Sequence, residues 1–456
     1  MPRRNPRGPK PPALPRGRRA ALGCDGEAAL DEHAIAHFLD QGIARTVRYA
    51  YAHSPFYRER FDAAGIKPGD IASCRDLAAL PLTSKKDVAE ADRKLWCVPM
   101  EKVVDICTTS GTTGTATLYP MTEGDLRRLG YNEYLSFGCA GLSARDVVLL
   151  ATTMDRCFIA GLAYFEGLRQ TGAAIIRVGS GPPSMLLGLL DRLRPTAAVS
   201  VPSFLKKVSA CAAESGVDLA GSTVKKLVCI GEPLRAPDFA LTHFGKHLAT
   251  AWGARMYSTY GITELAVSLC ECDAGRGGHL HPELVHLEVV DDDGRPVADG
   301  EAGEIVATTI GVEAMPLVRF QTGDCSFLDR RPCACGRRTP RIGPILGRKN
   351  QKLKIKGTTV YPAAVQRVLN DLDFVIDYVM IATSPSPLSD ELEVVVAVRG
   401  DADPSCRRIR EQLAGQLKVT PNVRAAGLGE VERLQNSRES RKKQVLIDRR
   451  RQQVGR

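Results

Sequence analysis

The chain alternates between short apolar segments and longer amphipathic segments from about residue 125 to residue 310. Apolar runs of this length fit buried strands, and the segments between them have the periodicity of helices. The alternation predicts right-handed β–α–β units and a mostly parallel sheet, in which ligands bind at the carboxyl ends of the strands. The predicted helices are 123–137, 158–171, 184–193, 203–214 and 237–247, and the predicted strands are 147–150, 174–178, 197–201, 226–230 and 254–258.

Two later changes of pattern indicate further parts of the fold. After Glu283 the sequence becomes strand-rich, which predicts a β subdomain with strands at 285–290 and 303–309. We expect an α/β protein with a large N-terminal domain, 26–346, of mainly parallel sheets with helices and the β subdomain. A hinge would join it to a small α+β C-terminal domain, 347–456. In that domain we predict a hairpin at 349–360, a helix opened by Pro362, strands at 375–382, 391–398 and 423–434, and a helix at 404–417.

The formal charge of +10 is concentrated at the two ends of the chain. Residues 1–20 carry +7 and residues 435–456 carry +6, which leaves −3 for the rest. Because the positive charge lies at the two ends and not on the folded part of the chain, the sequence argues against nucleic-acid binding. The sequence has neither an apolar run long enough to span a membrane nor the apolar core of a secretion signal. We expect a disordered basic arm at 1–25 and a cytoplasmic protein without nucleic-acid or membrane partners.

Residues 108–117 read Thr-Thr-Ser-Gly-Thr-Thr-Gly-Thr-Ala-Thr and lie between predicted strands. The loop carries seven hydroxyls and two glycines, with no charge. Its backbone N–H groups and hydroxyls can surround an anion, and glycine lets the chain approach phosphate closely. The same composition fits a solvated Ser/Thr turn. The loop alone therefore leaves both interpretations open.

Four shorter motifs follow this loop in the sequence. They are Ile230-Gly231-Glu232-Pro233, Tyr260-Gly261-Ile262-Thr263-Glu264, Gln321-Thr322-Gly323-Asp324 and Gly347-Arg348. Each alone fits an ordinary turn. Together with the loop, they resemble the adenylate-forming (ANL) superfamily of acyl-CoA synthetases, adenylation domains and luciferases, over about residues 30–450. Within it the chain is similar to the phenylacetate-CoA ligase branch, at His53–Arg58, Cys333–Arg337 and Gly357–Pro362.

The resemblance implies an AMP-forming acid–thiol ligase. ATP with Mg²⁺ would activate an aryl carboxylic acid as an acyl-adenylate, and coenzyme A would then displace AMP. Tyr260 would lie against the adenine, Asp324 would accept the ribose hydroxyls, and Glu264 would place Mg²⁺, which prefers oxygen ligands. The residues implied to bind the nucleotide are Ser110, Gly111, Thr112, Thr113, Gly114, Gly231, Glu232, Pro233, Tyr260, Gly261, Thr263, Asp324 and Arg348.

A lysine near the end of the chain completes the implied catalytic set with Glu264 and Thr113. Lys442 stands six residues before Asp448, the spacing that the resembling families use, and Lys443 is the adjacent alternative. A lysine is a compact charge on a long stem, which suits it to reach a carboxylate and the α-phosphate together. So many bases crowd this segment that a solvated tail without a catalytic role is also open.

Cysteine and histidine residues raise the question of a structural metal. Thiolates and imidazoles suit tetrahedral zinc, and the candidates are Cys270, Cys272, His279, His281, Cys333 and Cys335. The resemblance selects Cys272, His279, Cys333 and Cys335 as the zinc set. Ordinary reduced thiols are the alternative.

Departures from the family pattern leave the thiol acceptor less certain than the adenylation step. Thr115 and Asn350 stand where Lys and Asp are common, and Arg441 and Val445 where Gly and Arg are common. The alternative is an adenylating enzyme of a biosynthetic pathway with another acid or acceptor: a carrier protein, an amine, or nitrite activation for N–N bond formation. A nucleotide-binding regulatory or zinc-scaffold protein without chemistry is a third hypothesis. The sequence leaves the acid and the oligomeric state open, a homodimer included.

Overall fold

The computed structural model describes residues 32–109, 117–179, 181–355, 358–386, 389–436 and 444–450. The predicted arm at 1–25 lies outside these ranges. The chain divides into two compact units. The first runs to Leu241 and includes Gly245–Thr322 and Ser326–Pro344, and the second contains Thr242–Phe244, Gly323–Cys325 and the chain from Ile345 onward.

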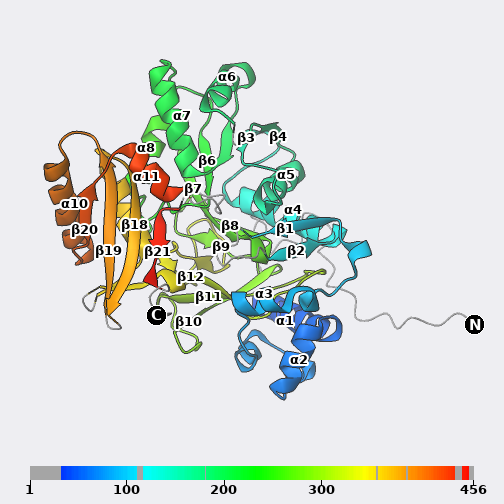
Figure 1. Cartoon of the computed structure of the whole chain (residues 1–456). Coiled ribbons are helices and arrows are strands. Elements are labelled where there is room, and N and C mark those ends of the chain that lie inside the picture. The colour runs from blue at the N-terminus through cyan, green and yellow to red at the C-terminus, as the bar shows by residue number, and fades with distance from the viewer. Residues whose placement is uncertain are drawn as a thin grey trace, which may run out of the picture. The chain divides into compact units, whose positions relative to one another are not determined.

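A largely parallel sheet forms the centre of the first unit (Figure 1). Its strand order is β4-β3-β5-β6-β7-β8. Neighbours are parallel except β7 and β8, which form an antiparallel hairpin. This sheet confirms the predicted α/β class. The strands are β3 (Val147–Ala151), β4 (Ala174–Arg177), β5 (Ala197–Ser200), β6 (Lys226–Ile230), β7 (Arg255–Ile262) and β8 (Val267–Cys270).

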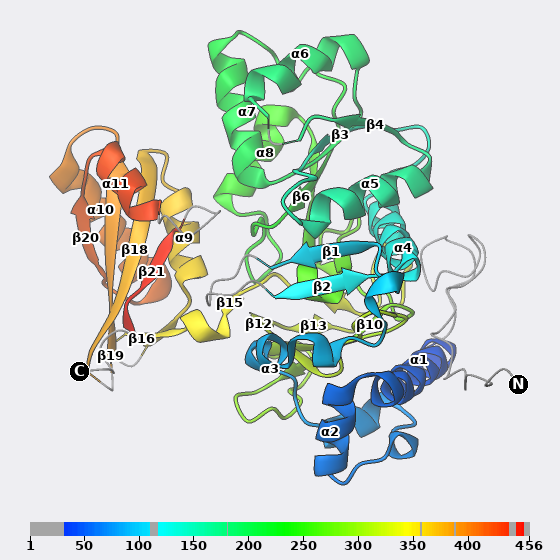
Figure 2. The ribbon, with the colours of Figure 1, turned by 45° about the vertical axis from the view of Figure 1, so that its right-hand side comes forward.

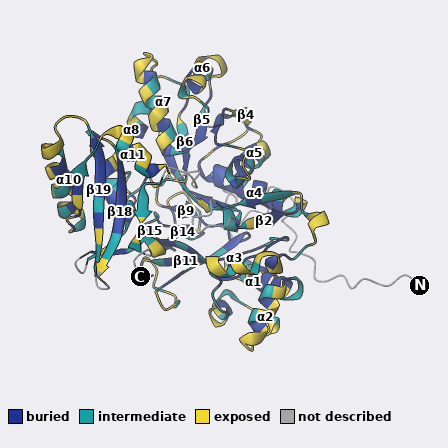
Figure 3. Cartoon of the chain, viewed as in Figure 1, coloured by how far each residue is buried: buried dark blue, intermediate teal, exposed yellow. Residues whose placement is uncertain are grey.

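Helices cover both faces of this sheet, with α4 and α5 on one side and α7 and α8 on the other (Figure 2). Strands β3, β5, β6 and β8 are largely buried, and their side chains are mostly apolar on both faces, as a sheet between helices requires, whereas the edge strand β4 is partly exposed. Figure 3 shows this burial along β5 and β6. The helices are α4 (Glu123–Cys139), α5 (Ile159–Thr171), α6 (Pro183–Leu193), α7 (Pro202–Glu214) and α8 (His243–Trp252).

One predicted helix of this region is placed wrongly. The sequence predicted 237–247, whereas α8 begins at His243. The preceding residues form a tight turn, in which the Asp238 carboxylate accepts the backbone N–H of Ala240 and Phe239 has a φ of 71°. An aspartate that bonds its own backbone two residues on favours a turn over a helix.

The remaining parts of the first unit are smaller. Strands β10 and β11 pair antiparallel, as the prediction of a β subdomain expected, and β12 follows β11 in the same sheet, although its residues Gly323–Cys325 belong to the second unit. The helices are α1 (Glu32–His53), α2 (Pro55–Ala63) and α3 (Lys85–Ala91). The strands are β1 (Asp105–Thr108), β2 (Leu118–Met121), β9 (Gly278–His279), β10 (Val285–Val290), β11 (Gly303–Thr309), β12 (Phe320–Ser326), β13 (Leu328–Asp329) and β14 (Arg341–Ile342).

The second unit contains a sheet of order β20-β19-β18-β21 with its own apolar core. The predicted strand at 423–434 is wrong beyond Ala425, because a helix begins at Leu428 after the extended Gly427. The strands are β15 (Gly347–Arg348), β16 (Leu353–Ile355), β17 (Thr358–Val360), β18 (Val375–Ser386), β19 (Ser389–Val398), β20 (Asn422–Ala425) and β21 (Leu446–Asp448). The helices are α9 (Pro362–Asn370), α10 (Ala402–Leu417) and α11 (Leu428–Gln435).

Of the helices in the described ranges, none has the length and apolar character needed to cross a membrane.

Candidate functional site

The hydroxyl-rich loop is flanked by an antiparallel hairpin. Strands β1 and β2 pair Thr108 with Leu118, and the Thr109 N–H donates to the Thr117 carbonyl at 3.3 Å. The predicted phosphate-binding residues between them, Ser110, Gly111, Thr112, Thr113 and Gly114, lie outside the described residues. The structure therefore describes the two residues that flank the loop, Thr109 and Thr117, which are hydrogen-bonded to each other.

The Tyr260–Glu264 motif lies at the tip of the β7–β8 hairpin. Tyr260 and Gly261 belong to β7, while Thr263 and Glu264 lie in a 3₁₀ turn, Thr263–Leu265, between the strands. Ala266 closes this turn in the left-handed conformation with a φ of 47°, and its N–H donates to the Thr263 carbonyl. The hairpin thus presents the Glu264 carboxylate on a short turn that is tied at both ends.

A lysine that the sequence analysis missed lies next to Glu264. The Lys85 ammonium is 3.3 Å from the Glu264 carboxylate, whose side chain is 9% exposed against 48% for Lys85. Lys85 is the first residue of α3, and Ser84 caps that helix with Asp87 in a capping box. A cation at a helix N-terminus opposes the helix dipole. That local conflict is the sequence signal that could have found Lys85.

Strand β2 contributes an aromatic residue to the surroundings of Glu264. Burial raises the pKa of the Tyr119 phenol, and the nearby Glu264 carboxylate raises it further. Tyr119 therefore stays neutral at physiological pH. The interaction also brings the strand that follows the hydroxyl-rich loop close to the β7–β8 tip.

The Gly231-Glu232-Pro233 motif follows the carboxyl end of β6, where the parallel sheet predicts ligand binding. Gly231 has a φ of 73°, which explains the glycine at this turn. The Glu232 carboxylate accepts the backbone N–H of Ser203 at 2.8 Å, in the first turn of α7. Glu232 therefore stabilises a helix N-terminus, and Gly231 and Pro233 stay exposed beside it.

Asp324 and Arg348, which the sequence analysis assigned to the ribose, come together within the second unit. They are register partners of β12 and β15, and the Arg348 guanidinium is 3.4 Å from the Asp324 carboxylate. The Asp324 side chain is 9% exposed and that of Arg348 is 49% exposed. At Gly347, a Cβ atom would lie 2.5 Å from the Tyr361 ring, so that position accepts only glycine.

The proposed catalytic lysine, Lys442, and its alternative Lys443 lie outside the described residues. The chain resumes at Gln444, whose backbone N–H donates to the Gln435 carbonyl at 3.0 Å. Strand β21 then pairs in parallel with β18 and ends at Asp448, which binds the Arg450 guanidinium. The described parts of this unit thus hold both ends of the lysine segment.

Cys272, His279, Cys333 and Cys335 form one cluster. Their ligand atoms all lie within 4.8 Å of one another, although the residues come from β9 and from loops far apart in sequence. The Cys272 and Cys333 sulfurs are 3.6 Å apart, and His279 Nε2 is 3.4 Å from the sulfurs of Cys272 and of Cys335. Tetrahedral zinc with its usual bond lengths needs ligand atoms about 3.5–3.8 Å apart.

Other features of the cluster also fit a metal. The second ring nitrogen of His279, Nδ1, lies 3.3 Å from the Thr339 hydroxyl, which fixes the ring orientation. The strand pairing of β14 with β9 and β13 supports this arrangement. The donor set suits Zn²⁺ and is poor for Mg²⁺.

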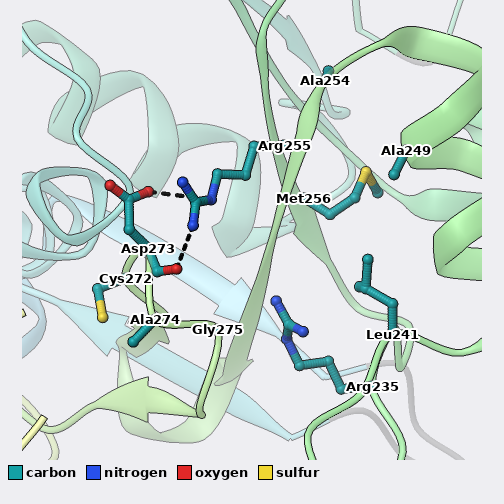
Figure 4. A pocket seen from close by; sticks show the side chains of 10 residues that line it. All are labelled: Arg235, Leu241, Ala249, Ala254, Arg255, Met256, Cys272, Asp273, Ala274 and Gly275. Carbon is teal, nitrogen blue, oxygen red and sulfur yellow. Dashed lines mark hydrogen bonds and ion pairs between the residues drawn. The ribbon is translucent and has the colours of Figure 1, made fainter. Parts of the chain in front are cut away.

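A buried ion pair links the cluster to the Gly231-Glu232-Pro233 loop. Arg235 donates to both oxygens of Glu271, at 2.5 and 2.7 Å, and Glu271 also accepts the Ser258 N–H. Beside this pair lies a cavity of about 290 Å³, in which Arg255 binds Asp273 (Figure 4). Apolar residues form its other wall, and no residue of the predicted nucleotide motifs lines it.

Comparison with known proteins identifies the family of the chain. Residues 27–314 match the family model of the AMP-binding enzymes. Phenylacetate-coenzyme A ligase of Thermus thermophilus is 30% identical over 397 residues, 86% of this chain and 87% of that protein. The corresponding ligase of Escherichia coli is 27% identical, over 89% of this chain and 93% of that protein.

A solved structure shares the fold over nearly the whole chain. It is 2-hydroxyisobutyryl-CoA ligase in the postadenylation state, in complex with R3-HIB-AMP. It covers 96% of this chain and 94% of its own with a TM-score of 0.80 and 22% identity.

Proposed function

Because the chain belongs to the AMP-binding enzymes, and within them to the phenylacetate-CoA ligase-like branch, we propose that it is an AMP-forming ligase. It activates an aryl carboxylic acid with ATP and transfers the acyl group to coenzyme A. The observation that carries this proposal is the likeness to phenylacetate-coenzyme A ligases over most of both chains.

In the first step, a carboxylate oxygen attacks the α-phosphorus of ATP and the bond to pyrophosphate breaks. Carboxylate and triphosphate repel each other, so the protein must position them and stabilise negative charge. Ser110, Thr112 and Thr113 would hold the β- and γ-phosphates. Mg²⁺, when bound with ATP, would neutralise charge on the phosphate oxygens, and the nearly buried carboxylate of Glu264 is the oxygen ligand that fits it.

Lys85 supplies the cation that the hydroxyl-rich loop lacks. The loop has Thr115 where related loops often have lysine, and Lys85 lies 3.3 Å from Glu264 with half of its side chain exposed. A flexible, hydrated ammonium can leave a carboxylate for a phosphate oxygen at small cost. We therefore assign Lys85 to the phosphates of bound ATP.

The other motifs would bind the nucleoside. Tyr260 stacks on the adenine, and the Gly231–Pro233 backbone borders it at the carboxyl end of β6. Asp324 accepts hydrogen bonds from the ribose hydroxyls, and the Arg348 guanidinium lies 3.4 Å from its carboxylate. The nearly buried position of Asp324 suits a group that binds two hydroxyls at once.

Lys442 contacts both reacting groups of the first step. Its ammonium bridges the attacking carboxylate and the α-phosphate, so Lys442→Ala should slow adenylation, and Lys443→Ala serves as the matched control. In the second step the coenzyme A thiolate attacks the acyl carbonyl, and the bond to AMP breaks.

We further propose that the Cys272, His279, Cys333 and Cys335 cluster binds a structural Zn²⁺. The described cluster offers a tetrahedral donor set at suitable separations. Metal analysis of the purified chain should give one zinc per chain, and Cys335→Ser should lower it. A full complement of zinc in a Cys272→Ser/Cys335→Ser double variant would contradict this assignment.

Pyrophosphate exchange over a panel of carboxylic acids tests the proposed function. We expect exchange with aryl acids and, on addition of coenzyme A, equal amounts of AMP and acyl-CoA. Absence of exchange with every acid, by folded protein that binds ATP, would contradict the proposal. AMP release without consumption of coenzyme A would indicate another acceptor.

A further inference from the structure

Helix α4 buries polar residues where an amphipathic helix would bury apolar ones. Asp125, Arg128, Asn132, Glu133 and Ser136 are all at most 4% exposed. They recur at helical spacing and face the segments that follow β7. Burying polar groups costs free energy unless each is hydrogen-bonded. Apolar side chains would pack here without that cost, which indicates a role of the polar stripe in the site.

Arg128 makes the most demanding set of contacts in this stripe. Its guanidinium donates to the carbonyls of Ile310 at 2.7 Å, Leu284 at 2.6 Å and Ala266 at 3.1 Å. Among the described residues, no carboxylate forms an ion pair with it. Burial lowers the pKa of Arg128 to about 10, so the group stays charged at neutral pH. Carbonyl dipoles from three separate segments thus replace water around a buried cation.

The Ala266 carbonyl connects Arg128 to the proposed magnesium ligand. Ala266 closes the Thr263–Leu265 turn that presents Glu264, and it does so in a conformation that side-chain-bearing residues adopt rarely. The hydrogen bond from Arg128 holds the carbonyl of this residue in place. The orientation of the turn, and of the Glu264 carboxylate on it, is therefore set from α4.

Three other residues of the stripe, Asn132, Glu133 and Ser136, hold the adjoining strand β8. Ser268 of β8 donates its N–H to the Asn132 side chain at 2.7 Å and its hydroxyl to Glu133 at 2.6 Å. Its carbonyl accepts the Ser136 hydroxyl at 2.7 Å. All the polar groups of Ser268 are thus bonded to one helix, which fixes β8 next to the turn that Arg128 holds.

The same helix is joined directly to the hydroxyl-rich loop. Strand β2 ends at Met121, Thr122 caps α4, and β2 pairs with β1 on the other side of the loop. We propose that Arg128 is a positioning residue for adenylation, which sets the orientation of Glu264 through the Ala266 carbonyl. This inference rests on the proposed function, since it assigns Glu264 to Mg²⁺ and the loop to phosphate.

The test measures ATP binding by calorimetry at increasing Mg²⁺, which requires no knowledge of the acid. For Arg128→Met we expect the Mg²⁺ concentration for half-maximal ATP binding to rise about tenfold or more, as for the loss of a hydrogen bond to a charged group. Arg128→Lys should recover part of the effect, with a rise of about threefold. ATP affinity in EDTA should stay unchanged. In pyrophosphate exchange, kcat should fall while the KM of the acid stays within about twofold.

A stability-matched control separates positioning from folding. Leu186 is a buried side chain of α6, and Leu186→Ala leaves a cavity where it packs. This variant should lower Tm without changing the Mg²⁺ requirement, because α6 is not part of the β7–β8 hairpin. If Arg128→Met does not fold, Arg128→Lys carries the test. An unchanged Mg²⁺ midpoint in the folded variants would overturn the Arg128 proposal alone. Normal Mg²⁺-dependent ATP binding without exchange for any acid would overturn the proposed function alone.

Discussion

Two glutamates of the β7–β8 region each contact a basic side chain, but in opposite ways. Glu271, just beyond the open end of the hairpin, is 1% exposed and binds Arg235 through two short hydrogen bonds. Glu264, at the tip, meets a half-exposed Lys85 through a single contact at 3.3 Å. The first pair is fixed by desolvation and geometry, whereas the second can exchange its partner. The comparison separates a group that holds the fold from a group that is available for a ligand.

The strongest test of this contrast is Glu264→Gln. The amide keeps the shape but loses the charge that attracts Mg²⁺, so we expect pyrophosphate exchange to fall about a thousandfold, comparable to the loss of one preorganised transition-state contact. Thermal unfolding should barely change, because the pair with Lys85 is worth at most about 1 kcal/mol. Glu264→Asp is the matched control and should retain part of the activity. A large decrease in Tm of Glu264→Gln would show that Glu264, like Glu271, mainly stabilises the fold.

The reciprocal test is Glu271→Gln. It leaves the Arg235 guanidinium buried without its carboxylate, and we expect the free energy of unfolding in urea to drop by about 3–5 kcal/mol. Burial raises the pKa of Glu271, and the ion pair with Arg235 offsets part of that rise, which indicates a substantial desolvation cost. The double variant Arg235→Met/Glu271→Leu should recover much of the stability. If Glu271→Gln loses pyrophosphate exchange but no stability, Glu271 acts in the reaction and our assignment of it to the stability of the fold is wrong.

Lys85→Met should have a smaller effect, confined to the nucleotide. Loss of one hydrogen bond from a charged group to phosphate should raise the KM for ATP about ten- to a hundredfold. Lys86 is the neighbouring control, because it pairs with Glu90 on the exposed side of α3. Steady-state kinetics of Lys85→Met and Lys86→Met therefore measure the role of the exchangeable partner. Equal KM values in the two variants would exclude Lys85 from ATP binding.

The last prediction concerns a third glutamate, Glu133, which forms no ion pair with a basic side chain among the described residues and whose effect on stability depends on pH. Burial raises the pKa of Glu133 to about 8, partly offset by the Ser268 hydroxyl. The folded state thus keeps a proton that the unfolded state loses near pH 4–5, so stability falls as the pH rises from about 5 to 8, by at most about 1.4 kcal/mol per unit. Glu133→Gln should remove this slope in urea unfolding measured across that range. A slope identical to that of the wild type would show that Glu133 is ionised in the folded protein.

The sequence predicted those parts of the fold that local pattern controls. Strands β6, β10 and β11 begin and end where the sequence predicted, because β6 is a short apolar run and β10 begins with alternating buried and half-buried residues, both of which are typical of strands. The start of α8 was misplaced, since the turn at Asp238 and Phe239 competes with a helix over the same residues. The helix α11 was missed for a similar reason, because its apolar residues also suit a strand.

The residues of the candidate site also fall into two groups, those that local motifs predict and those that only the structure reveals. Motifs of fixed spacing predicted Tyr260, Glu264 and Asp324, and the family resemblance selected the cysteine–histidine set, whose four ligand atoms the structure brings together. Lys85 and Arg128 were not predicted, since a lysine or an arginine in a helix is usually solvated; the position of Lys85 in the first turn of α3 is the one local signal, and Arg128 has none. Their roles depend on contacts with residues more than a hundred positions away.

By itself, the sequence determined the class of fold, the order of the motifs and the identity of the groups available for chemistry, because these follow from short-range periodicity and residue type. Only the tertiary structure decided which charges are buried, which carboxylate is locked by an arginine and which one keeps an exchangeable partner. Desolvation and hydrogen-bond geometry set those properties, and both are created when distant segments pack together.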